Sequence, residues 1–423
     1  MNIKYTFTGI FGDYHSIKYR PELDGLRAIA VLSVLFFHEK LPYFSGGFLG
    51  VDIFFVLSGY LITKIIVKNI ANNSFSILDF YSRRARRILP ALFLVVLFSI
   101  FFGYLWFLPG DFHSFAKNVF SVLFFYSNIN FWLDDGYFSI ANNIKPLLST
   151  WSLSVEEQFY IVFPILLIFL NKLNKINFVI FLLFLLSFSL SIYASYNHPS
   201  ANFYLSPTRA WELLLGSLVF VTESSVFVRN VERFSQSLSI IGITLIIFSM
   251  SYFDSSTLHP GALTLIPVIG SACVIWFANS KTLVGRVLSS RALIFIGVIS
   301  YGLYLWHWPI FAFYEYRFGG GDVFVYLLLI CLSIILSYLS WNYIEKPFKE
   351  NGSLGKFNSV SVLGLIALLI LLVSYYIFSN EGMKERFTPY ELNLIETSEY
   401  SPMREKCHAY DDVNTSVKSA CEY

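Results

Sequence analysis

Residues 20–41, RPELDGLRAIAVLSVLFFHEKL, decide the class of fold. From Gly25 onward this stretch is an apolar run of about the length that crosses a bilayer as an α-helix, yet it contains Arg27 and His38. Ionisable side chains inside a membrane are costly unless they face a polar or paired interior. The stretch therefore predicts a membrane helix that belongs to a bundle with a polar interior.

The rest of the chain has the composition of a protein that crosses the membrane many times. Of its 423 residues, 56% are hydrophobic, 14% are charged and 45 are Phe, whereas about 25% of a soluble chain is charged. A water-soluble globule is excluded. The net charge of +2 is spread between apolar runs and provides no basic face for nucleic acid. Membrane lipid is therefore an expected partner and nucleic acid is not.

Eleven apolar runs are near the length of a membrane-crossing helix, and none shows the alternation of a barrel strand. The sequence therefore predicts an all-α polytopic bundle with ten core helices and one additional helix. Residues 109–151 are expected to form an outer-face or re-entrant helix. The runs extend over approximately 25–41, 48–67, 88–108, 152–171, 176–196, 207–222, 236–253, 262–278, 291–314, 322–343 and 358–379.

The distribution of Lys and Arg predicts the orientation, because short basic loops stay in the cytoplasm. With the N-terminus inside, the inner segments hold 19 of these residues and the outer loops hold five, namely Lys40, Lys117, Lys145, Arg209 and Arg317. Residues 1–20 are polar and form the predicted cytoplasmic segment. The tail after Asn380 is then outside, where Cys407 and Cys421 either close a 15-residue loop or remain two free thiols.

Arg27 and His38 are eleven residues apart. At 100° and 1.5 Å per residue they project from nearly the same helix face, about 16 Å apart along the axis. A His is a suitable general base near neutral pH. The alternative is an interfacial His that only bonds a neighbouring helix.

A cluster of arginines, FYSRRARRILP at residues 80–90, precedes the third crossing. Guanidinium groups bind phosphate in a bidentate manner, and Arg83 shares a helix face with Arg86 or with Arg87. The alternative is that the cluster only holds topology and contacts anionic lipid.

Four more ionisable residues are expected toward the outer side. Asp52 enters the second crossing, where it could orient or balance His38. Glu156 and Glu157 begin the fourth crossing and point about 100° apart, so that one of them can face inward. His307 lies between two tryptophans in the ninth crossing, where a structural role is the commoner one.

In chain order, five blocks resemble the acyltransferase-3 family, which contains bacterial membrane-bound O-acyltransferases that modify cell-surface carbohydrates. The resemblance covers roughly residues 19–348. It implies transfer of an acyl group, most often acetyl, from cytoplasmic acyl-coenzyme A to a sugar hydroxyl at the outer face. The blocks are RPELDGLRAIAVLSVLFFH, GGFLGVDIFFVLSGYLIT, FYSRRARRILPALF, STWSLSVEEQFYIVFP and SYGLYLWHWP.

The resemblance also implies roles for individual residues. Arg27 and His38 match the functional pair of the family, Arg83 and Arg86 match its Arg-x-x-Arg motif, and Glu156 matches the acid of its VE-x-QFY block. Acetyl-coenzyme A is the expected donor, without a metal. Its phosphates would dock at the arginine motif, and His38 would act as base or as acyl carrier, oriented by the acid.

The implied domains are an acyltransferase domain at residues 21–348, a linker with one additional crossing at 349–380, and a periplasmic tail at 381–423. The tail resembles the start of a linker to an SGNH-type hydrolase-like domain, whose Gly-Asp-Ser block does not occur in this sequence. The implied location is the bacterial inner membrane, and the implied acceptor is a surface or lipid-linked polysaccharide such as the O-antigen of lipopolysaccharide.

Two rival hypotheses come from other classes of protein. The same intramembrane charges would line the pathway of a transporter or flippase for a lipid-linked saccharide. A non-catalytic assembly partner is the third hypothesis, under which the charged interior has no purpose.

Overall fold

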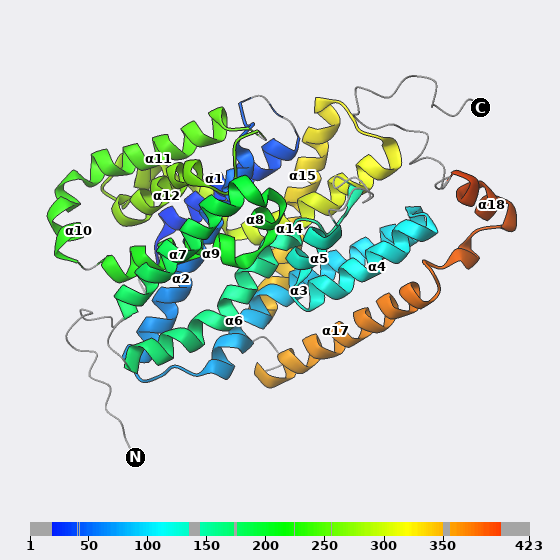
Figure 1. The fold of residues 1–423 in the computed structure, drawn as a ribbon, viewed down its shortest axis with the longest axis horizontal. Helices are drawn as coiled ribbons and strands as arrows, with labels where there is room; N and C mark the ends of the chain where they lie inside the picture. Colours follow the sequence, from blue (N-terminus) through cyan, green and yellow to red (C-terminus); the bar gives the residue numbers. More distant parts are fainter. Residues whose placement is uncertain are drawn as a thin grey trace, which may run out of the picture.

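The computed structural model describes residues 19–39, 41, 43–134, 144–172, 176–223, 225–254, 256–349 and 356–398. Within these residues every regular element is a helix (Figure 1), so the all-α prediction is confirmed. Most of the predicted N-terminal segment and the part of the tail after Ser398, with Cys407 and Cys421, lie outside the described residues.

Each of the eleven predicted runs falls on one helix. In the described chain, eight helical segments are long and apolar enough to cross a membrane. The chain is therefore a multi-pass membrane protein, while the number eleven and the orientation stay predictions. The helices are α1 (Pro21–His38), α2 (Gly50–Ala71), α3 (Ile77–Trp106), α6 (Thr150–Lys172), α7 (Ile176–Asn197), α9 (Ser206–Thr222), α11 (Ser235–Tyr252), α12 (Leu265–Phe277), α14 (Arg291–Phe318), α15 (Val323–Ser340) and α17 (Lys356–Ser379).

The helices α1, α9 and α12 are not among the eight, for two reasons. The helices α12 and α9 are short, with 13 and 17 residues, whereas α1 carries Glu22, Asp24 and Arg27 within its 18 residues. All three pack against other helices: α1 on α14 and α2, α9 on α2 and α7, and α12 on α11. A helix with buried neighbours can pair its charges with them, which a lipid-facing helix cannot do.

The contact between α2 and α9 depends on two glycines. A Cβ atom at Gly59 would lie 1.8 Å from the carbonyl oxygen of Leu213, and one at Gly216 would lie 2.0 Å from that of Val56. Only glycine allows the two backbones to approach this closely. This approach brings charged side chains of both helices within hydrogen-bond distance of one another.

Two helices, α4 (Pro109–Leu123) and α5 (Ser127–Asp134), occupy the segment for which one helix was predicted. They are separated by a turn in which Phe125 has a φ of 54°. The helix α17 packs along α4 and α3 at the edge of the molecule (Figure 1). The shorter helices are α8 (Pro199–Tyr204), α10 (Val226–Val231), α13 (Leu283–Leu288), α16 (Lys346–Lys349) and α18 (Pro389–Ser398), and a π-helical turn, Trp341–Glu345, precedes α16.

Candidate active site

Two cavities of different chemistry share part of their lining. The arginine cavity, of about 110 Å³, is lined by Arg27, Arg84 and Arg87. The histidine cavity, of about 290 Å³, contains His38 in its lining. Val51 and Tyr304 line both cavities. The two cavities therefore meet at these two side chains.

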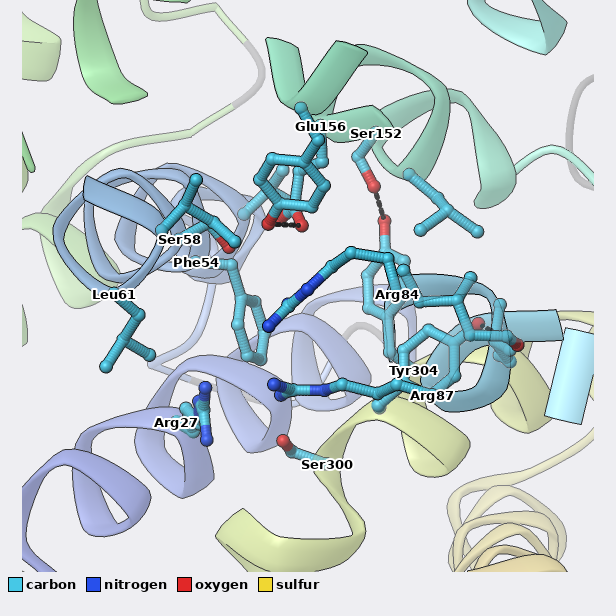
Figure 2. A pocket seen from close by; sticks show the side chains of 17 residues that line it. Arg27, Phe54, Ser58, Leu61, Arg84, Arg87, Ser152, Glu156, Ser300 and Tyr304 are labelled. Carbon is cyan, nitrogen blue, oxygen red and sulfur yellow. Dashed lines mark hydrogen bonds between the residues drawn. The ribbon is translucent and has the colours of Figure 1, made fainter. Parts of the chain in front are cut away.

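The arginine cavity gathers its cations from two helices. Arg27 comes from α1, whereas Arg84 and Arg87 come from α3, and Figure 2 shows their side chains extending in the same direction toward Arg27. The Arg27 Nη1 atom donates to Asp24 Oδ1 at 3.0 Å. Glu156, from α6, is the one carboxylate in the lining. Three guanidinium groups against one carboxylate leave the lining positively charged at neutral pH.

Arg83 and Arg86, the predicted donor-binding pair, do not line this cavity. Arg83 is exposed, and Arg86 is buried with its Nε donating to the Ser82 carbonyl oxygen at 3.4 Å. One step along a helix turns a side chain by 100°. The pair that shares the cavity-facing side of α3 is therefore the one shifted by a single residue, Arg84 and Arg87.

His38 ends α1 and lies among aromatic rings. Its ring centroid is 4.4 Å from that of Trp308 and 5.5 Å from that of His307. The Nδ1 atom of His307 lies 3.3 Å from the Leu303 carbonyl oxygen, so Nδ1 carries the proton and donates it. The structure thus brings His307 beside His38. Arg27 and His38 extend from the same helix into the two different cavities.

Glu156, which was expected to orient the His38 imidazole, does not line the histidine cavity. It lines the arginine cavity and accepts a hydrogen bond from Tyr160 Oη at 2.8 Å. Its position, six residues after Thr150 at the start of α6, places it about 9 Å along the helix axis. There it shares a cavity lining with Arg27, Arg84 and Arg87.

Asp52 forms an ion pair with Arg209. It is fully buried, and its Oδ1 accepts from Arg209 Nη1 at 3.0 Å. The same nitrogen donates to Glu212 Oε1 at 2.8 Å and lies 3.2 Å from His259 Nε2. The expectation that Asp52 supports His38 is therefore replaced by a buried cluster of Asp52, Arg209, Glu212 and His259, which we call the Arg209 cluster.

The hydrogen bonds of the Arg209 cluster indicate which ring nitrogen of His259 carries the proton. Arginine nitrogen can only donate, so Nε2 of His259 accepts and Nδ1 carries the proton toward Thr264 Oγ1 at 3.1 Å. His259 lies in the loop between α11 and α12, where burial lowers its pKa to about 4. With both ring nitrogens engaged, His259 is not available as a base. His38 is the remaining histidine in the lining.

Sequence reasoning missed Arg209, His259 and Tyr304. The charge count placed Arg209 in an outer loop, although Glu212 three residues later is the spacing of an ion pair on one helix face. Nothing in the sequence around His259 marks it, because its partners come from α2 and α9. Tyr304 lies in the quoted SYGLYLWHWP block, but its place between two cavities depends on how α14 packs.

Comparison with known proteins identifies the family of the chain. The sequence profile of the family described as "Acyltransferase domain" matches residues 20–342. Peptidoglycan O-acetyltransferase OatA of Listeria monocytogenes is 32% identical over 364 residues, covering 81% of this chain and 58% of the relative. The Bacillus subtilis protein YrhL, provisionally named a peptidoglycan O-acetyltransferase, is 32% identical, covering 79% of this chain and 56% of its own.

A Staphylococcus aureus (strain N315) protein, provisionally named an O-acetyltransferase, is 32% identical over 359 residues, covering 81% of this chain and 59% of its own. The chain thus spans between 56% and 59% of the length of these curated relatives. No solved structure matches it. The family profile covers the helices that build both cavities, and the chain belongs to the acyltransferase-3 family of acyltransferase domains.

Proposed function

We propose that the protein transfers an acyl group, acetyl in the simplest case, from acyl-coenzyme A to a hydroxyl group of a cell-surface glycan. One observation carries the proposal: a cavity with three arginines and a cavity with His38 meet at Val51 and Tyr304. A polyanionic donor and a neutral acceptor can then occupy opposite sides of one reaction centre.

The arginine cavity provides the chemistry that the donor requires. The planar guanidinium group presents a fork of N–H donors, which binds a phosphate group, such as those of coenzyme A, through paired hydrogen bonds. Arg84 and Arg87 extend side by side toward Arg27 (Figure 2). We assign the phosphate contacts to Arg84 and Arg87 in place of Arg83 and Arg86. Arg27 lies where the arm that carries the thioester would pass.

His38 is the proposed base. In direct transfer, its imidazole removes the proton of the acceptor hydroxyl while the hydroxyl oxygen attacks the thioester carbonyl. The carbon–sulfur bond breaks, and the leaving thiolate takes the proton back from the imidazole. In the other route the acyl group resides on His38 before it passes to the hydroxyl. The close ring of Trp308 holds the imidazole in place.

The histidine cavity has the lining of a sugar site. Flat aromatic rings from Trp151, Phe203 and Trp308 surround it, and polar groups from Ser149 and Thr257 can bond hydroxyls. The names of two relatives point to peptidoglycan. We therefore propose a surface polysaccharide or its lipid-linked precursor as the acceptor, with peptidoglycan added to O-antigen as a candidate. The proposed location is the bacterial inner membrane, with residues 381–423 on the periplasmic side.

The test supplies acetyl-labelled coenzyme A to membranes that contain the protein and follows label in the surface glycan. Wild-type protein should transfer label, and His38→Ala should transfer none while it inserts normally. His198→Ala is the matched control, since His198 is exposed and lines neither cavity. A transporter or flippase would move glycan without label, so unlabelled glycan with the wild type would overturn the proposal.

A further inference from the structure

Tyr304 stands at the junction of the two cavities. It comes from the middle of α14 and lines both of them, together with Val51. Its ring centroid lies 6.2 Å from that of Phe54 and 5.5 Å from that of His307. The large ring therefore fills the space between the arginines on one side and the histidines on the other.

The tip of Tyr304 is held by α6 and the residue before it. Its Oη donates to the Ser149 carbonyl oxygen at 3.1 Å and lies 2.7 Å from Ser152 Oγ, which then donates to it (Figure 2). These are the bonds of its hydroxyl in the described chain, and both end on one short segment. The ring packs against its neighbours by apolar and aromatic contacts, which a rotation of the side chain can exchange.

We propose that Tyr304 is a gate between the donor and acceptor cavities. In this structure the gate is closed, and it must turn aside before the acyl group can reach His38. This inference rests on the proposed acyl transfer. Its consequence is coupling: while the gate is closed, water in the histidine cavity cannot reach the thioester.

Without the gate the donor is open to hydrolysis. The oxygen of water attacks the thioester carbonyl carbon, the carbon–sulfur bond breaks, and the thiolate takes up a proton. Acetate and the free thiol of coenzyme A are released, and no glycan is modified. The gate thus determines how much thiol is released for each acetyl group that reaches the acceptor.

The first experiment measures that ratio, free thiol released per acetyl group on glycan, for Tyr304→Ala and Tyr304→Phe. We expect the ratio to rise about tenfold or more in Tyr304→Ala and less in Tyr304→Phe, which keeps the ring but loses both bonds at its tip. Tyr316→Phe is the control on the same helix, because Tyr316 bonds Asp111 and lines neither cavity. Equal loss of hydrolysis and acylation in Tyr304→Ala would indicate a purely structural residue and overturn the gate.

A second experiment does not depend on activity. All four native cysteines are replaced by serine, and Ser58→Cys places a single thiol in the arginine cavity. An anionic probe, 2-sulfonatoethyl methanethiosulfonate, is added to intact cells on the outer side. We expect Tyr304→Ala to raise the rate of labelling at this position about tenfold.

The matched thiol is Thr257→Cys in the histidine cavity, whose labelling Tyr304→Ala should leave unchanged. An unchanged rate at Ser58→Cys would overturn the gate. If the wild type transfers no acetyl group at all, the proposed function fails, and this labelling still decides whether Tyr304 separates the two cavities.

Discussion

The two cavities differ in how their arginines are paired. In the arginine cavity Arg27 pairs with Asp24, so the contrast lies between Arg209 in one cavity and Arg84 and Arg87 in the other. In the histidine cavity, Arg209 is fully buried and its Nη1 donates to both Asp52 and Glu212. In the arginine cavity, no carboxylate of the described chain forms an ion pair with Arg84 or Arg87. A neutralised arginine contributes to the architecture, since burying charge requires partners. An arginine left without a carboxylate is available for an anionic ligand, which is why we assign the donor phosphates to one cavity only.

The largest effect should come from His38, because it is the one base assigned to the reaction. We expect His38→Ala to lower acyl transfer by about 10²–10⁴-fold, the usual contribution of a general base. The donor KM should stay close to that of the wild type, since the arginine cavity is intact. If His38→Ala instead raised only the donor KM and left kcat unchanged, the histidine cavity would bind the donor. The separate assignment of donor and acceptor to the two cavities would then be wrong.

The Arg209 cluster should matter for stability. Arg209→Met leaves the carboxylates of Asp52 and Glu212 buried without their cation, which typically costs about 3–5 kcal/mol of unfolding free energy. Adding Asp52→Asn and Glu212→Gln to Arg209→Met should restore part of that loss. Thermal unfolding in lipid nanodiscs measures both. If Arg84→Met destabilises the protein as much as Arg209→Met, the contrast between the two cavities is wrong.

The combination of Arg84→Ala with Arg87→Ala should act on the donor alone. Loss of the phosphate contacts should raise the donor KM about 100-fold, equivalent to about 2.7 kcal/mol, with little change in kcat. Arg83→Ala is the matched control, since Arg83 is exposed on the same helix and does not line the cavity. An equal increase in KM for Arg83→Ala would favour the predicted pair Arg83 and Arg86 instead.

The fold was largely predictable because hydrophobic length is a local property of the sequence. Every predicted run coincides with a helix, and in the described part of the segment at 109–151 the turn at Phe125 divides the predicted helix into α4 and α5. Of the arginine cluster, Arg84 and Arg87 line the cavity, whereas the predicted pair was Arg83 and Arg86. Successive side chains of a helix point about 100° apart. The sequence therefore places the arginines in the cluster at 80–90 but does not show which two of them face the cavity.

The partners of Asp52 could not be predicted, since they depend on packing between distant segments. Asp52 and His38 are close in sequence and at the same expected depth, which made their pairing plausible. The close approach of α2 and α9 at Gly59 and Gly216 instead brings Asp52 to Arg209. Only three-dimensional packing decides whether Asp52 pairs with His38 or with Arg209, because each of them lies 14 or more positions from Asp52 in the chain.

The smallest effect that we predict is a pH dependence of stability from His259. Burial lowers its pKa to about 4, against an ordinary value near 6.5, and the nearby Asp52 only partly offsets this. Between these two pH values the unfolded chain binds a proton at this position and the native protein does not, so the native protein loses stability as the pH falls. The expected loss between pH 7 and pH 5 is about 2 kcal/mol.

His259→Gln isolates this contribution, because glutamine does not titrate and can still accept a bond from Arg209. The difference in unfolding free energy between pH 7 and pH 5 should therefore be about 2 kcal/mol smaller in His259→Gln than in the wild type. Measurements in nanodiscs at both pH values give that difference directly. Equal losses in the two proteins would mean that His259 is protonated in the native state, and the Arg209 cluster would then carry a second positive charge beside Arg209. The cluster would then hold two cations against the two carboxylates of Asp52 and Glu212 at pH 5, in place of the single cation that the structure indicates.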